Sequence, residues 1–203
     1  MTGHLFVDAK TTGIRSDLHD VWEIAIIDDR GHEYAWQVAP DLTHADQRTL
    51  EAGRFHSRHF TATDGDAPPG GALVTAHRLE ALVGGYVFVE TAAREAADLL
   101  NGAEGSYSDL TNHGRPDRFL APWLRRHGQE WHGRGHSDLL SLGWSLLIPS
   151  CPEMARTSPC SYGRGISRSF GVEPEHYARY TALGTCRWLR ALWEAMSPSL
   201  REA

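Results

Sequence analysis

Two oppositely charged side chains stand two residues apart near the beginning of the sequence, in the run Leu5-Phe6-Val7-Asp8-Ala9-Lys10. The apolar residues predict a strand over residues 5–9. Side chains two apart on an extended segment point to the same face, so we expect the Asp8 carboxylate and the Lys10 ammonium to meet. At about 4 Å and an effective dielectric constant of about 20, such a pair attracts by roughly 4 kcal/mol before desolvation is subtracted.

Three segments of the sequence, in the same order, match the motifs of one enzyme family. Residues 5–13 (LFVDAKTTG) and 22–27 (WEIAII) resemble the opening of the DnaQ-like (DEDDh) 3′–5′ exonucleases, in which Asp-x-Glu-Thr-Thr-Gly precedes a hairpin strand. Residues 112–120 (NHGRPDRFL) resemble the second motif, Asn-x-x-Phe-Asp-x-x-Phe-Leu, and residues 180–188 (YTALGTCRW) resemble the third, His-x-Ala-Leu-x-Asp-Ala. The resemblance spans roughly residues 4–196.

This resemblance implies an RNase H-like fold and a particular chemistry. In that family two divalent cations about 4 Å apart clamp the scissile phosphate, one activating water and the other steadying the leaving oxygen. Hard cations need several oxygen ligands, so four carboxylates converge from three elements. A histidine near the attacked phosphate acts as the general base.

The first two motifs depart from the family at their chemical positions. Asp8 is kept, but Lys10 stands where the family has glutamate. The acid of the second motif aligns with Pro116 when Phe119 and Leu120 are held in register. Asp117 comes one residue later and serves only if the backbone shifts.

The third motif departs as well. The resemblance places Tyr180 at the histidine position and Thr185 at the position of the last aspartate. A second register takes His176 as the base, but it puts Thr181 at the aspartate position and loses the Ala-Leu match. We therefore prefer the register of Tyr180. Asp8, Lys10, Asp117, Tyr180 and Thr185 are then the residues of a degenerate catalytic site.

Charge arithmetic turns these departures into a hypothesis. The family brings four negative charges to two dications, whereas Asp8, Lys10, Thr185 and the Pro116/Asp117 position sum to 0 or −1. Such a site does not compensate the desolvation of two Mg²⁺ ions. We expect that Lys10 replaces the metal as the counter-ion of Asp8, that no cofactor is bound, and that two-metal hydrolysis is lost.

Two classes of function follow, and a third is weaker. In the first, the chain is a non-catalytic exonuclease-like module that binds the end of a single-stranded DNA or RNA, a nucleotide or a protein partner. In the second, it is an active exonuclease that uses Mg²⁺ or Mn²⁺ on a non-standard ligand set of Asp8, Asp117, Glu95 and His176. The third is a purely structural or assembly role. We favour the first.

Four residues are the candidates for contact with nucleic acid. Thr11 and Thr12 belong to the first motif, and Asn112 begins the second. Arg134 lies in the Gly-flanked basic segment 131–136, a loop type that can cradle phosphate. A second pair, His56 and His59, lacks an acid or cysteine at metal-ligand spacing, so we interpret it as a solvated helix face.

The elements that would position these residues follow from apolar periodicity and turn formers. We expect strands over residues 5–9, 22–28, 32–38, 86–90 and 107–111. We expect helices over residues 43–54, 75–83, 91–100, 118–127, 138–147 and 181–196. The turn formers of residues 64–71 predict an internal loop. Interleaved strands and helices indicate an α/β fold, a mixed sheet flanked by helices, in a single domain over residues 1–203.

Composition bounds the remaining classes. The chain has 203 residues, 41% of them hydrophobic and 23% charged, which excludes a disordered or collagen-like protein. A formal charge of −6 argues against a protein that coats nucleic acid by bulk electrostatics. No apolar run reaches the roughly 18 residues of a membrane span, so we expect no membrane partner. With no signal peptide recognised, we expect a cytoplasmic protein; an oligomer is left open.

The three cysteines, Cys151, Cys160 and Cys186, are an odd number without a secretory signal, which favours free thiols. A bridge between Cys151 and Cys160 is the open alternative.

Overall fold

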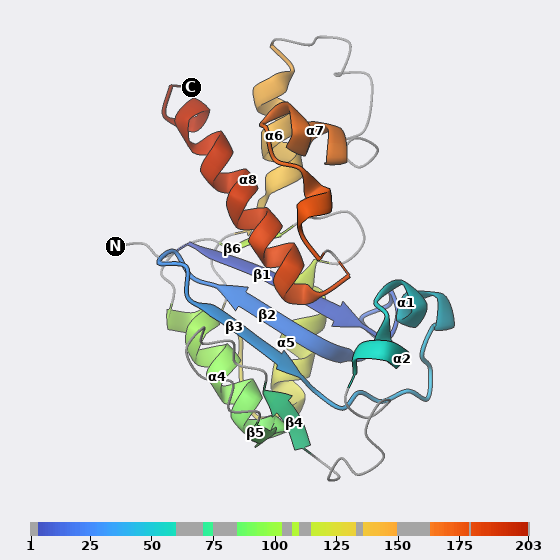
Figure 1. The fold of residues 1–203 in the computed structure, drawn as a ribbon. Helices are drawn as coiled ribbons and strands as arrows, with labels where there is room; N and C mark the ends of the chain where they lie inside the picture. The colour runs from blue at the N-terminus through green and yellow to red at the C-terminus, as the bar shows by residue number, and fades with distance from the viewer. Residues whose placement is uncertain are drawn as a thin grey trace.

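Seven strands form one sheet in the computed structural model, which describes residues 4–59, 71–74, 85–102, 107–109, 115–132, 136–149, 163–178 and 180–202. The strands lie in the order β5-β4-β3-β2-β1-β6-β7 (Figure 1). Their bounds are β1 Leu5–Thr11, β2 Val21–Ile27, β3 Glu33–Gln37, β4 Gly71–Val74, β5 Gly85–Phe88, β6 Tyr107–Asp109 and β7 His136–Asp138.

The sheet is mixed. Neighbours from β5 to β1 pair antiparallel, whereas β6 runs parallel to β1 and β7 runs parallel to β6. The turn between β2 and β3 has Gly31 in the left-handed region at φ 87°, where a side chain would be strained. The α/β fold with a mixed sheet that the sequence predicts is therefore confirmed.

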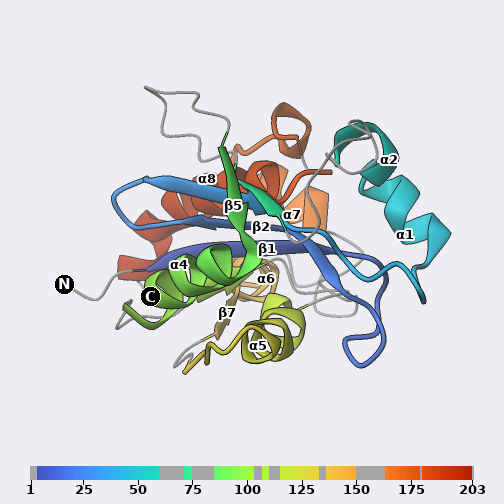
Figure 2. The same ribbon diagram turned by 90° about the horizontal axis from the view of Figure 1, so that it is seen from below.

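Helices cover both faces of this sheet. The helices α4 and α5 lie on one face, and α8 with α6 and α7 lies on the other (Figures 1 and 2). The short helices α1 and α2 lie beside the end of β1 at which that strand finishes. The bounds are α1 Gln47–Ala52, α2 Phe55–Arg58, α4 Val89–Gly102, α5 Pro116–Arg126, α6 Leu139–Leu147, α7 Gly163–Ser169, the 3₁₀ helix η3 Pro174–His176 and α8 Ala182–Glu202.

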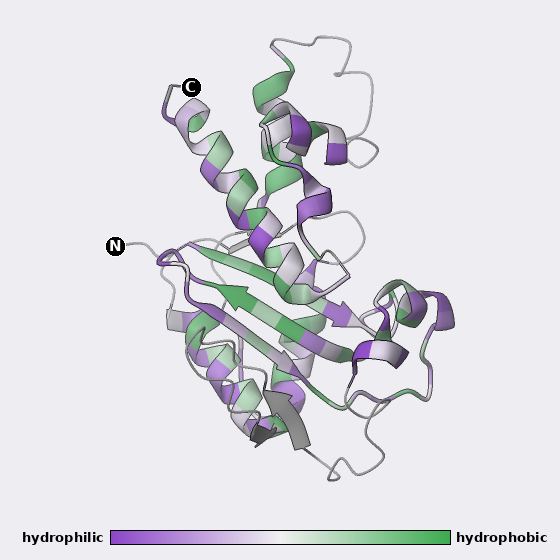
Figure 3. Cartoon of the chain, in the orientation of Figure 1, coloured by the Kyte–Doolittle hydropathy of each residue, from purple (hydrophilic) through white to green (hydrophobic). Residues whose placement is uncertain are grey.

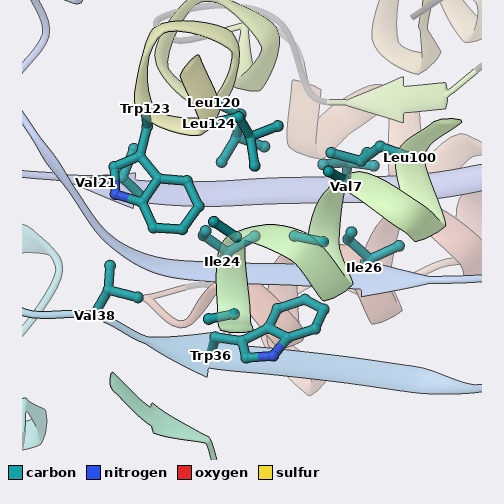
Figure 4. Packing of buried hydrophobic residues seen from close by; sticks show 14 of the residues in the cluster. Val7, Val21, Ile24, Ile26, Trp36, Val38, Leu100, Leu120, Trp123 and Leu124 are labelled. Carbon is teal, nitrogen blue, oxygen red and sulfur yellow. The ribbon is translucent and has the colours of Figure 1, made fainter. Parts of the chain in front are cut away.

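Alternation along the central strands divides the core into two clusters. Leu5 and Val7 of β1 pack with α4 and α5, together with Trp36 and Trp123 (Figure 4). Phe6 points the other way and packs with α6 and α8. The middle of β2 is apolar on both faces, as its hydropathy shows in Figure 3. Because side chains alternate, Asp8 and Lys10 share the face of Phe6, beneath α8.

Several predicted boundaries were wrong. Residues 89 and 90 begin α4 instead of ending a strand, so β5 stops at Phe88. Of the helix expected over residues 43–54, only Gln47–Ala52 is helical, as α1, and a separate helix, α2, begins at Phe55. The last helix continues beyond Met196 to Glu202 and includes Pro198. Sequence patterns mark such ends weakly, since packing decides whether a last turn holds.

Some expectations fall outside the described residues. The helix over 75–83, the pair Cys151 and Cys160, and all but the final residue of the 64–71 loop belong there, and that final residue, Gly71, opens β4. Cys186 is a free, buried thiol whose Sγ lies 3.4 Å from the Ala25 carbonyl oxygen. Within the described residues, no helix is long and apolar enough to cross a membrane.

Candidate functional site

The ammonium group of Lys10 lies between the first and third motifs. Its Nζ is 2.6 Å from Oδ2 of Asp8. It also donates a 3.1 Å hydrogen bond to Oγ1 of Thr185, from the first turn of α8. The structure therefore brings together Asp8, Lys10 and Thr185, three residues that the sequence analysis placed at one site.

The backbone explains why these groups meet. Asp8 and Lys10 follow the two-residue period of β1, and Lys10 pairs with Glu23 of β2 in the antiparallel register. A register irregularity follows Lys10 and ends the regular pairing. Thr185 donates its own hydroxyl proton to the Thr181 carbonyl 3.0 Å away, so its oxygen acts as the acceptor toward Lys10.

The ion pair is largely enclosed. The side chains of Lys10 and Asp8 are 20% and 18% exposed, so solvent screens them only in part. Oδ2 of Asp8 is buried, and apart from the ammonium no donor within the described residues reaches it. Removing the ammonium would thus leave a buried anionic oxygen without a partner, which is unfavourable.

This donor set does not suit a pair of divalent cations. One carboxylate, one hydroxyl and one ammonium supply too few anionic oxygens, and the ammonium stands where a cation would bind Asp8. Within the described residues, no three Asp, Glu, His or Cys side chains gather closely enough to hold a metal ion.

Asp117 lies in the first turn of α5, where a negative charge is favoured by the helix dipole. Both its oxygens are taken by the Arg115 guanidinium, at 3.1 and 2.6 Å. Its ionic partner is therefore its own neighbour in the chain and not a group on β1.

The alternative ligand set does not assemble. Glu95 belongs to α4, on the opposite face of the sheet from Asp8, and accepts a 3.2 Å hydrogen bond from the Trp36 indole. His176 ends η3. Asp8, Asp117, Glu95 and His176 all belong to the described residues and form no metal-holding group. This grouping, inferred from residue type alone, was wrong because residue type does not reveal which face of the sheet a helix covers.

Of the four candidate nucleic-acid contacts, the structure describes Thr11 and Thr12. The Thr12 side chain is buried, and its hydroxyl accepts the Asp20 backbone N–H at 2.8 Å, so it fixes the loop after β1 and is not available to a ligand. The Thr11 hydroxyl donates to the Gly13 carbonyl at 2.6 Å. Asn112 and Arg134 lie outside the described residues.

Sequence reasoning missed a buried ion pair beside Lys10. Glu23 is 5% exposed, and the Arg58 guanidinium donates to both of its carboxylate oxygens, at 2.7 and 2.8 Å. Arg58 also donates to the carbonyls of Gly53 and Tyr180, each at 2.9 Å. A glutamate inside the apolar run VWEIAII was the available signal, because a buried carboxylate requires a partner.

Tyr180 is held from two sides. Its carbonyl accepts from Arg58, and the Arg54 guanidinium lies 4.1 Å from the centre of its ring. At 37% exposure, the ring remains accessible to solvent. At the residue that the sequence analysis aligned with a histidine, the structure thus has an aromatic ring in a cation–π contact.

The expectation of a solvated face at His56 and His59 was half wrong. His56 is exposed, but His59 is buried and its Nε2–H donates to the Val38 carbonyl at 3.0 Å. Burial lowers the pKa of His59 to about 4. Its ring stacks on Phe55, which packs on Trp22, so this histidine belongs to a small aromatic core.

Comparison with known proteins gives a fold likeness without a sequence family. No protein-family model and no curated protein matches the sequence. Among solved structures, E. coli exonuclease I in complex with a 5cy-dT13 oligonucleotide is similar at a TM-score of 0.64 and 14% identity, over 100% of this chain and 42% of that chain.

Two further structures of E. coli exonuclease I are similar to this chain to the same degree. The zinc ion bound form of its single-stranded DNA complex gives a TM-score of 0.65 at 14% identity, and a dT13 complex gives 0.63 at 15% identity. They cover 100% of this chain and 42% and 43% of the other. This chain therefore spans less than half the length of those proteins and shares their fold.

The buried glutamate gives the site a testable pH dependence. Burial raises the pKa of Glu23 above its ordinary value of 4.5, against the lowering effect of Arg58 and Lys10. Folded Glu23 thus keeps its proton to higher pH than unfolded Glu23, so its contribution to stability is complete below about pH 4.5 and declines as pH rises through the raised pKa. The test is to measure the unfolding free energies of wild type and Glu23→Gln in urea. As the pH rises from about 4 to about 7, we expect the unfolding free energy of wild type to fall relative to that of Glu23→Gln.

The partner of that glutamate supplies the control. Arg58→Met leaves the carboxylate buried and unpaired, so we expect a loss of about 3–5 kcal/mol in unfolding free energy near pH 7. The loss should shrink near pH 4, where Glu23 is protonated. Equal losses at the two pH values would contradict this description of the pair.

Proposed function

We propose that this chain is a DnaQ-like, RNase H-like exonuclease-fold module that binds single-stranded nucleic acid at an end and does not hydrolyse it. A fixed ammonium takes the electrostatic place that divalent cations hold in the catalytic relatives of this fold. The observation that carries the proposal is the position of Lys10 Nζ, 2.6 Å from Asp8 and 3.1 Å from Thr185.

The loss of hydrolysis rests on charge. In the relatives the acids of three motifs hold two cations, and water is activated on one of them. Here Asp8 is neutralised by Lys10, Thr185 carries no charge, and Asp117 is paired with Arg115. Tyr180, at the position of the general base, has no imidazole, and its ring lies against the Arg54 guanidinium.

Nucleic-acid binding is supported by the same arithmetic. An empty cluster of four carboxylates repels phosphate, whereas one carboxylate paired with an ammonium does not. Arg54 adds an exposed cation at the edge of the site. The similar solved structures include complexes of exonuclease I with single-stranded oligonucleotides, which supports the choice of ligand class.

Binding and its salt dependence can be measured together. We expect a fluorescein-labelled single-stranded oligonucleotide to bind in anisotropy titrations, with log K falling linearly as log[salt] rises, because phosphate contacts release counterions. Lys10→Glu should weaken binding about tenfold or more, since it places two carboxylates beside the phosphates. Labelled DNA and RNA should keep their length in Mn²⁺.

The matched control is Arg125→Glu, which makes the same charge change at an exposed position of α5, across the sheet from Lys10. It should leave the affinity within about twofold of wild type, because solvent screens a charge at that distance. An absence of strand binding at low salt would overturn the binding proposal. Shortening of the strands in Mn²⁺ would favour the active nuclease.

Restoring the family residues tests the role of the ammonium. Lys10→Glu with Thr185→Asp and Tyr180→His adds two acids and an imidazole to Asp8, so that four positions of the first and third motifs carry the residues of the family. We expect this triple variant to bind Mn²⁺ at least about tenfold more tightly than wild type in calorimetric titration, because the anionic oxygens that a hard cation needs are then present. Equal Mn²⁺ affinity in the two proteins would contradict the assignment of Lys10 as the resident counter-ion.

A further inference from the structure

An open hollow of about 500 Å³ lies beside the charged site, lined by Ala52, Arg54, Glu175, Tyr177 and Tyr180. Its size falls within the roughly 300–1,000 Å³ in which proteins bind small organic ligands. Two aromatic rings, one cation and one carboxylate thus share one hollow.

The cation of this hollow is fixed by an unusual backbone. Arg54 adopts the left-handed conformation at φ 56° and ψ 35°, the one positive φ among the described residues other than glycine. Its carbonyl accepts the Ser57 N–H at 3.2 Å and the Ser57 hydroxyl at 3.1 Å, which holds that conformation in place. The strained turn directs the guanidinium onto the Tyr180 ring, 4.1 Å from its centre.

The hollow is connected to the charged site through Arg58. The Arg58 guanidinium donates hydrogen bonds to the Glu23 carboxylate and to the Tyr180 carbonyl. Glu23 stands opposite Lys10 in the register of β1 and β2. Tyr180 directly precedes the helix turn that carries Thr185. A strand whose end contacts Lys10 would therefore have its next or terminal base close to the hollow.

The lining favours a base over a phosphate. Glu175 lines the same hollow as Arg54, and one of its carboxylate oxygens lies 3.0 Å from the Arg168 guanidinium. Its pKa is lowered by its own backbone N–H and by Arg168, so it is anionic at neutral pH. Among the lining residues a phosphate would find one cation, Arg54, whose guanidinium already lies over the Tyr180 ring. A flat, uncharged base can instead stack on an Arg–Tyr surface and donate its amino group to a carboxylate.

We propose that this hollow is a stacking subsite for one nucleobase of the bound single strand, with Arg54 and Tyr180 as its stacking surface and Glu175 as an acceptor for the base's exocyclic amino group. The proposal rests on the proposed function, because the strand brings the base to the hollow.

Fluorescence of 2-aminopurine, a base that dims on stacking, reports on the subsite directly. Two oligonucleotides carry it at the 3′ or the 5′ terminus, and anisotropy of a fluorescein label on parallel samples reports binding. We expect quenching of one terminus on binding to wild type and to Tyr180→Phe. Tyr180→Ala should lose the quenching and weaken binding about tenfold, the scale of one base–aromatic stack.

Arg54→Asn tests the second half of the surface, because asparagine tolerates the left-handed backbone while lacking the guanidinium. It should reduce both quenching and affinity, whereas Arg125→Asn, which removes an exposed arginine on α5, should change neither. Circular dichroism of each variant checks the fold.

The outcomes separate the two proposals. Unchanged affinity and quenching in Tyr180→Ala and Arg54→Asn, with normal strand binding, would overturn the subsite and leave the proposed function standing. Failure of wild type to bind any strand would overturn the proposed function and the subsite with it.

Discussion

The ion pair between Asp8 and Lys10 is the constraint on which the rest of the site depends. A lysine on a sheet face that is covered by a helix needs an anion and a hydrogen-bond acceptor. Here Asp8 supplies the anion and Thr185 the acceptor. The ammonium joins β1 to α8 through Thr185, so one side chain both neutralises the carboxylate and ties the last helix to the first strand. The negative charge of Asp8, which would otherwise attract a divalent cation, is thereby neutralised by the Lys10 ammonium.

A second charged link runs parallel to the first. The Glu23–Arg58 pair joins β2 to α2 and, through the Tyr180 carbonyl, to the segment before α8. Both links cross the same face of the sheet, and each combines a buried or half-buried carboxylate with a cation from another part of the chain. Asp8 and Glu23 therefore each have a cationic partner. A ligand at this site would meet the Arg54 guanidinium and the Tyr180 ring instead of unpaired carboxylates.

Much of this fold follows from sequence pattern, and less of the site does. The continuous apolar run of β2 and the alternation of β1 predict a sheet with Asp8 and Lys10 on one face, and the structure agrees. The partners of Glu23 and Tyr180 were not predictable, because Arg58 and Arg54 reach them only after two short helices fold back on β2. Contacts between distant segments depend on backbone geometry, such as the left-handed turn at Arg54, which arginine as a residue type does not indicate.

The most direct test of the account is a crystal structure grown in Mn²⁺, with data collected at a wavelength where manganese scatters anomalously. The account predicts no anomalous peak beside Asp8 and an ordered Lys10 ammonium within hydrogen-bond distance of both Asp8 and Thr185. A manganese ion coordinated by Asp8, with the lysine side chain displaced toward solvent, would contradict it.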